Sequence, residues 1–136
     1  MKEKTVLFFC LYLEKVKQIM AAHNDLGRKG EEKAVEYLVR EGYVVLERNW
    51  RLKHRELDVI CLKGDLLVVV EVKTRDLPEE HPEELLDYRK RRNIRIATDA
   101  YIKAKGIRAE VRFDLILVIG PDLKIEHVKE AIQVFE

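Results

Sequence analysis

A short hairpin pattern near the middle of the chain constrains the fold more than any other feature of the sequence. The apolar run Leu66–Val70 leads directly into the polar sequence 71–73, and a second strand-like run covers residues 56–62. Only residues 63–65 separate the two runs, and Gly64 at their centre tolerates the positive φ of a tight turn. We therefore expect two adjacent antiparallel strands in a β-sheet.

Two carboxylates are expected to meet at one end of this hairpin. Side chains alternate between the faces of a strand, so Glu71 and Lys73 share one face. On the preceding strand, Leu57 and Val59 turn away from the face that carries Asp58. The short turn can place Asp58 beside Glu71, and two such carboxylates are unfavourable unless a cation neutralises them. Because Mg²⁺ prefers oxygen ligands, the pattern predicts metal-assisted phosphodiester hydrolysis, with Lys73 close to the reaction.

Length and charge indicate one small domain whose basic residues are clustered. A chain of 136 residues with 47% hydrophobic composition can bury an adequate single core. The net charge is only +1, so the distribution of charge says more about partners than the sum does. One basic cluster covers residues 89–95, and a second comprises Arg48, Arg51, Lys53 and Arg55. The two cysteines lack the spacing of metal ligands, so we interpret them as reduced thiols. Reduced thiols are typical of cytoplasmic proteins, and we expect the protein in the cytoplasm.

The first 22 residues form a segment of their own. The apolar run Val6–Leu13 is too short to span a membrane. Apolar residues recur at helical a and d positions, at Val6, Phe9, Leu13, Val16 and Met20. One interpretation is an amphipathic helix that packs on the domain or on a second copy, and the other is an incidental extension before a start near Met20. We therefore divide the chain into an N-terminal extension, residues 1–22, and a domain, residues 23–136.

The remaining pattern predicts an α/β fold with a mixed sheet flanked by helices. A first helix is capped by Asn24 or Asp25 and stops at Gly42. A second long helix begins near Pro82 and ends by Gly106. Strands are expected at residues 43–49, 56–62, 66–73, 110–119 and 125–132. The third and fourth strands should be joined by a right-handed parallel crossover.

A glutamate lies on the apolar stripe of the first helix. The stripe follows the i, i+3, i+4, i+7 spacing of one helix face, at Glu31, Ala34, Val35 and Leu38. Glu31 therefore points at the sheet, whereas Glu32 lies on the flank and can be solvated. Such a carboxylate either joins a metal site with Asp58 and Glu71 or bonds to backbone amides at the N-terminus of the helix.

Other residues also have two interpretations each. Lys90 lies on an apolar stripe of the second helix, so either its ammonium snorkels into water or it contacts a phosphate beside Lys73. Trp50 could stack on a base, but a lone tryptophan more often belongs to the core. For Asp114 we favour a capping or salt-bridge role over support of the site. The histidines at positions 23, 54, 81 and 127 show no metal-site spacing.

The order of these motifs resembles a known group of nucleases. Asp58 followed by Glu71-x-Lys73 resembles the core of the PD-(D/E)xK nuclease superfamily. Four segments narrow the resemblance to the YraN-like family of predicted endonucleases, which is related to archaeal Holliday-junction resolvases. They are Gly27-Arg28-Lys29-Gly30-Glu31, Asn49-Trp50-Arg51, Glu71-Val72-Lys73-Thr74-Arg75 and Arg112-Phe113-Asp114. The resemblance covers Asn24 to Glu136, and Arg55 stands where the family usually has a glycine.

The resemblance implies a restriction-endonuclease-like fold, αβββαβ, and an endonuclease that cuts DNA, including branched repair or recombination intermediates, with Mg²⁺ or Mn²⁺. Asp58 and Glu71 would bind the metal with the backbone carbonyl of Val72, and Glu31 would be a further ligand, directly or through water. Lys73 would orient the attacking water. Glu56 would support the ligands from behind. Contacts with nucleic acid would come from Lys90, Arg91, Arg75 and Arg51.

Two other functions fit the same sequence. The first is a non-catalytic nucleic-acid-binding module of the same fold, although intact Asp58, Glu71 and Lys73 argue against lost catalysis. The second is a structural or interaction protein whose charges form a solvated surface. Resolvase-like cutting would require a homodimer, because two active sites must act together. No membrane partner is expected.

Overall fold

A five-stranded mixed sheet forms the centre of the molecule. The computed structural model describes residues 2–133, apart from the side chains of residues 2, 3 and 23. The strands follow one another in the order β1-β2-β3-β4-β5. Their bounds are Val44–Leu52, Arg55–Lys63, Leu66–Arg75, Glu110–Ile119 and Lys124–Ile132. β3 and β4 pair in parallel and the other neighbours pair antiparallel, which confirms the predicted hairpin and the parallel pairing across the crossover.

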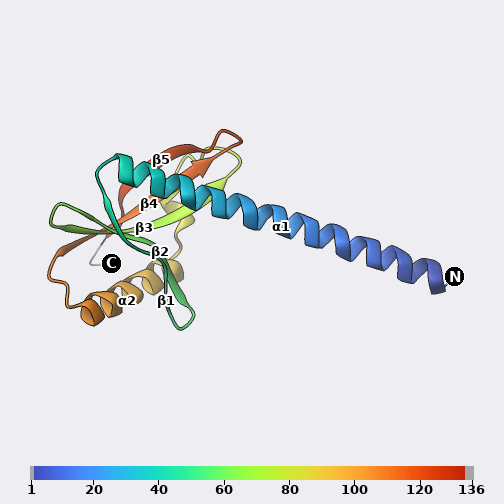
Figure 1. Ribbon diagram of the computed structural model, residues 1–136, viewed down its shortest axis with the longest axis horizontal. Coiled ribbons are helices and arrows are strands. Elements are labelled where there is room, and N and C mark those ends of the chain that lie inside the picture. Colours follow the sequence, from blue (N-terminus) through green and yellow to red (C-terminus); the bar gives the residue numbers. More distant parts are fainter. Residues whose placement is uncertain (1, 134–136) are drawn as a thin grey trace.

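Helices cover both faces of the sheet. The C-terminal part of α1 (Lys2–Arg40) lies on one face and α2 (Tyr88–Lys105) on the other (Figure 1). The core on the α2 side includes Ile60, Leu67, Val69, Ala97 and Leu115. The core on the α1 side includes Ala34, Leu38, Val68, Val70 and Ile116. This mixed α/β architecture is consistent with the expected restriction-endonuclease-like fold.

The first helix is longer than predicted. We expected it to begin at Asn24 or Asp25, but α1 is continuous from Lys2 to Arg40. No glycine or proline occurs before Gly27 to interrupt it, and Asp25 pairs with Arg28 one turn later instead of capping a helix. The predicted stop is confirmed, since Gly42 takes a φ of +89° just after the last turn.

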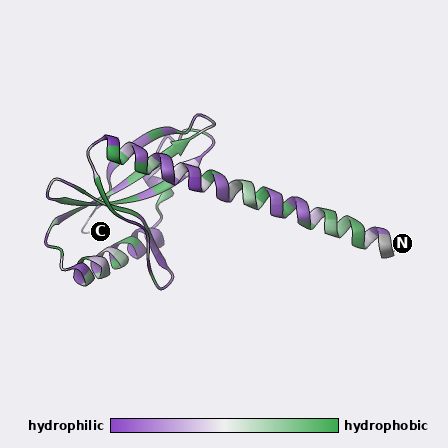
Figure 2. Ribbon diagram, in the orientation of Figure 1, coloured by the Kyte–Doolittle hydropathy of each residue, from purple (hydrophilic) through white to green (hydrophobic). Residues whose placement is uncertain are grey.

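The N-terminal part of α1 projects away from the domain (Figure 1), and much of it is apolar (Figure 2). From residue 4 to residue 22 its side chains are exposed, apart from the half-buried Val16, and Phe8 reaches 75% exposure. The interpretation that this segment packs on its own domain is therefore wrong, whereas packing on a second copy stays a prediction. Within residues 2–133, no helix carries an apolar stretch long enough to cross a bilayer.

The second helix begins later than predicted. Pro82–Leu85 forms only a short 3₁₀ helix, η1, and α2 starts at Tyr88. Leu86 is extended, and Asp87 then caps α2 by accepting a hydrogen bond from the backbone N–H of Lys90 at 2.8 Å. Aspartate is a strong N-cap, so it sets the start of the α-helix in place of the upstream proline. The end at Gly106 is as predicted.

Candidate functional site at a fork in the sheet

β2 and β3 separate at the point where the predicted carboxylates lie. The last pair of their ladder is Val59 with Val70. Beyond it β2 stays paired only with β1, while β3 stays paired only with β4. Asp58 and Glu71 are the next residues on the two diverging strands, and the N–H of Val72 donates to Oδ2 of Asp58 at 2.9 Å. The structure therefore brings Asp58 and Glu71 together, as expected.

The side-chain alternation of β2 breaks at the fork. We expected Leu57 and Val59 on one face, but Leu57 packs in the core under α2 and Val59 in the core under α1. On β1, Asn49 lies between the pairs that Val59 and Leu57 form, and its φ of 52° is left-handed. This local change of conformation accompanies the break in alternation on β2 at Asp58.

The fork opens into a cleft of about 920 Å³ between α1, the sheet and the start of α2. Its lining includes all side chains predicted for catalysis, and Lys90 besides. They are Glu31, Asp58, Glu71, Lys73 and Lys90, together with Val72. Arg28 and Arg48 also line the cleft, and sequence reasoning did not single them out as site residues. The available signal for Arg28 was its place one turn before Glu31.

The other predicted nucleic-acid contacts lie outside this cleft. Arg91 lines a separate hollow of about 540 Å³ beside η1 and β5. Arg51 is 74% exposed and lies 3.7 Å from Glu56. Arg75 donates to the carbonyl oxygen of Thr74 at 2.8 Å. Of the four basic residues predicted to bind nucleic acid, the structure brings only Lys90 to the carboxylates.

Glu71 is the most perturbed carboxylate of the cleft. It is 4% exposed. Burial and the neighbouring charge of Asp58 raise its pKa to about 7, against the opposing effect of Lys90 and Lys73. The Nζ atoms of these lysines lie 3.0 Å (Lys90) and 3.8 Å (Lys73) from Oε1 of Glu71. Lys90 therefore pairs with Glu71 and does not simply extend into water.

Glu31 faces the fork from the interior of α1. It is half-buried and Glu32 is exposed, which confirms the predicted helical phase, while the alternative of a capping glutamate is wrong. Burial and Asp58 raise the pKa of Glu31. With its amide nitrogen turned to the carboxylates, Asn49 donates to Oε1 of both Glu31 and Glu56, each at 3.0 Å. Asn49 thus links α1, β1 and β2 around the cleft.

A close helix–sheet contact holds Glu31 at this position. A Cβ atom on Gly30 would lie 2.2 Å from Oγ1 of Thr74 on β3. A side chain at position 30 would overlap the Thr74 hydroxyl, so glycine lets α1 approach β3 this closely without moving Thr74. The Gly27–Glu31 segment lies within α1, although we expected it to open a helix, and its Gly30 serves packing against β3.

The donor set suits a hard divalent cation. Asp58 and Glu71 provide neighbouring carboxylates, one of them buried, and Val72 and Glu31 add further oxygen atoms. Among the described residues, no three acidic, histidine or cysteine side chains are placed so that they could hold a metal ion by themselves. Mg²⁺ is commonly held by one or two carboxylates, with water and substrate phosphate completing its coordination. The residues at the fork fit that mode of binding.

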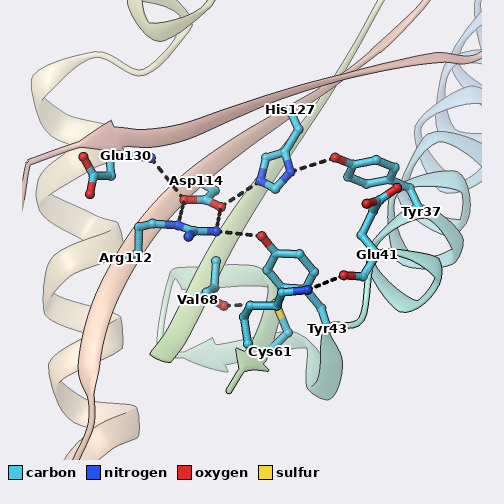
Figure 3. Close-up of polar contacts among 10 residues, drawn as sticks. Tyr37, Glu41, Tyr43, Cys61, Val68, Arg112, Asp114, His127 and Glu130 are labelled. Atoms are coloured by element: carbon cyan, nitrogen blue, oxygen red, sulfur yellow. Dashed lines mark hydrogen bonds and ion pairs between the residues drawn. The ribbon is translucent and has the colours of Figure 1, made fainter. Parts of the chain in front are cut away.

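Asp114 belongs to a separate polar network on the α1 side of the sheet (Figure 3). It is 1% exposed and accepts two hydrogen bonds of 2.8 Å from Arg112, while Nε2 of His127 lies 2.7 Å away. Tyr37 and Tyr43 extend the network from α1 and from the start of the sheet. Although burial opposes ionisation, these bonds hold the pKa of Asp114 below its ordinary value. The favoured salt-bridge role is confirmed.

Trp50 and His127 both have structural partners in the folded protein. Trp50 packs against the core, with its ring centroid 5.2 Å from that of Tyr101, so the core interpretation holds. The contact of His127 with Asp114 was not predicted, because a histidine on a mostly polar strand gives no signal of its partner 13 residues upstream. The one available signal was the spacing Arg112-x-Asp114, which puts both side chains on one strand face.

The family model of uncharacterised protein family UPF0102 matches residues 30–118. A UPF0102 protein of Bacteroides fragilis is 49% identical over 115 residues, which cover 82% of this chain and 95% of that protein. A UPF0102 protein of Rhodococcus jostii is 40% identical over 116 residues, which cover 81% and 98% of the two chains. The chain therefore belongs to the UPF0102 family, the YraN-like family that its motifs resemble.

Proposed function

We propose that this protein is a divalent-metal-dependent endonuclease that hydrolyses phosphodiester bonds of DNA. The observation that carries the proposal is the buried carboxylate of Glu71 beside Asp58 at the fork, with Lys73 in the same cleft. A buried carboxylate with a raised pKa, beside a second carboxylate in an open cleft, is a typical functional arrangement. The resemblance to PD-(D/E)xK nucleases supports the reaction class.

Each residue has a role in this proposal. Asp58, Glu71 and the carbonyl oxygen of Val72 would hold Mg²⁺ or Mn²⁺, with Glu31 as a further ligand, directly or through water. The cation would neutralise these carboxylates and polarise the phosphodiester. Lys73, whose side chain is 27% exposed, would orient the attacking water and stabilise negative charge that develops on the phosphate.

DNA would enter along the open side of the cleft. Lys90 and Arg48 lie on its walls and would contact phosphates beside the scissile bond. The resemblance to resolvases extends the proposed substrates to branched intermediates, for which two copies of the site are needed. The proposed location is the cytoplasm, where free thiols such as those of Cys10 and Cys61 persist.

A plasmid-nicking assay with Mg²⁺ or Mn²⁺ tests the proposal. Wild type should convert supercoiled plasmid to open circles, and Asp58→Asn should abolish this. Asp65→Asn, in the exposed turn of the same hairpin, should nick like wild type and serves as the matched control. If the wild type binds DNA but never nicks it, the non-catalytic module replaces the nuclease. Equal nicking by wild type and Asp58→Asn would remove Asp58 from the mechanism.

A further inference from the structure

Lys90 occupies the part of the cleft that faces Glu71. Its Nζ lies 3.0 Å from Oε1 of Glu71, closer than the 3.8 Å of Lys73. The side chain of Glu71 is 5% exposed, and that of Lys90 is 35% exposed. The carboxylate is therefore enclosed, whereas the lysine paired with it has an open route to solvent.

The backbone around Lys90 is fixed from two directions. Its N–H donates to the capping side chain of Asp87 at 2.8 Å. One turn later Asn93 accepts a hydrogen bond of 3.1 Å from Nε of Arg55 on β2. The start of α2 is thus tied to the sheet, and the ammonium group of Lys90 can leave Glu71 by rotation of its own side chain.

We propose that Lys90 is an internal cation that competes with the divalent metal for Glu71, so that metal binding releases its ammonium group toward the substrate phosphate. This inference rests on the proposed function. Without a metal, the carboxylates of Asp58 and Glu71 are balanced by the two lysines in the cleft. A dication at the same carboxylates would repel an ammonium group in contact with Glu71. Lys90 is the group that yields, because its stem is flexible and partly exposed.

The exchange couples two binding events. While Lys90 pairs with Glu71, it is less available to a phosphate group. Once the metal holds Glu71, the same ammonium group becomes a free phosphate ligand at the wall of the cleft. Metal and phosphodiester therefore strengthen each other's binding, and by linkage the effect is the same in both directions.

Calorimetric titration of the full chain with Mg²⁺ and with Mn²⁺, in the absence of nucleic acid, tests the competition. Lys90→Met removes the charge and keeps the length of the side chain, so it should lower the Kd by about tenfold, equivalent to one pKa unit of lost interaction. Lys103→Met is the matched control in the same helix, because Lys103 is 76% exposed and pairs with Asp99 outside the cleft. Its Kd should equal that of wild type.

Lysine acetylation followed by mass spectrometry tests the release in the wild-type protein, which also covers the case that Lys90→Met does not fold. Mg²⁺ should speed acetylation of Lys90 and leave Lys103 unchanged. If neither cation binds wild type or variant, the metal site and the proposed function both fail. If the cations bind wild type, but Lys90→Met binds no tighter or Lys90 labelling does not rise, the competition alone is refuted.

Discussion

Glu71 combines two conditions that rarely occur together, a buried carboxylate and a second carboxylate next to it. The lysines reduce this electrostatic cost but do not remove it, because the pKa of Glu71 still rises to about 7. The folded protein therefore holds a proton on Glu71 at pH values where the unfolded chain has already lost it. Stability and metal binding should both depend on pH through the ionisation of Glu71.

The first prediction concerns the stability of the metal-free protein. Burial and the neighbouring Asp58 raise the pKa of Glu71 from its ordinary value of 4.5 to about 7 in the folded protein. The folded protein binds a proton at Glu71 more tightly than the unfolded chain does. The resulting contribution to the free energy of unfolding is fully present below pH 4.5 and is lost as pH rises through about 7. Glu71→Gln should flatten this decline, which we expect to be about 1–3 kcal/mol. Urea unfolding between pH 5 and 8 measures it, with Glu84→Gln on exposed η1 as control. An unchanged slope in Glu71→Gln would contradict the prediction.

The second prediction separates two adjacent glutamates. Glu31 faces Asp58 and has a raised pKa, so Glu31→Gln should relieve repulsion and raise the melting temperature of the metal-free protein. The same change should reduce nicking. Glu32→Gln, exposed on the neighbouring position, should alter neither property. Melting curves and nicking rates suffice, and a greater effect at Glu32 would refute the assigned roles.

At the scale of elements, most of the fold could be predicted from the sequence. Apolar runs and turn residues located all five strands, because a strand buried on one or both faces has a matching pattern of apolar residues in its own sequence. The break in alternation at Leu57 was not predictable, since it depends on the conformation of Asn49 on another strand. The continuity of α1 was missed because Asn24 and Asp25 are good caps in isolation, and nothing local shows that they lie inside a helix.

The third prediction tests the contact between α1 and β3. Gly30→Ala should destabilise the protein by about 1–3 kcal/mol, because the new Cβ would overlap Oγ1 of Thr74. Gly27→Ala is the matched control in the same helix, with no atom within 4 Å of its Cβ, and should stabilise by about 1 kcal/mol. Thr74→Ala should restore much of the loss in Gly30→Ala. Thermal unfolding of the two glycine variants, of Thr74→Ala and of the double variant Gly30→Ala/Thr74→Ala decides, and equal effects at the two glycines would refute close packing.

The whole molecule presents a nearly neutral surface, with a net charge of +1, so binding to DNA must depend on where its cations lie. The basic segment at the start of α2 is contiguous in sequence but divided in space. Lys90 lines the main cleft, and Arg91 lines the hollow beside η1. Side chains of successive residues in an α-helix point about 100° apart, so neighbours in sequence lie on different surfaces of the molecule.

The fourth prediction follows from this division. In the presence of Mg²⁺, Lys90→Ala should reduce the slope of log affinity for DNA against log salt concentration by about one unit, as expected for one lost phosphate contact. Arg91→Ala should leave the slope unchanged. Fluorescence anisotropy over a salt series measures both. A reduced slope for Arg91→Ala with an unchanged slope for Lys90→Ala would place the DNA on the opposite side of α2.

The uninterrupted course of α1 has a mechanical consequence. One helix carries both the projecting apolar segment and Glu31, so a rigid tilt of that helix about the contact of Gly30 with Thr74 would displace both together. The arm beyond that pivot is about 40 Å long. A partner bound to the projecting segment would be held in a defined orientation relative to the cleft. A tilt at the far end would displace the Glu31 carboxylate by a much smaller distance, because Glu31 lies next to the pivot.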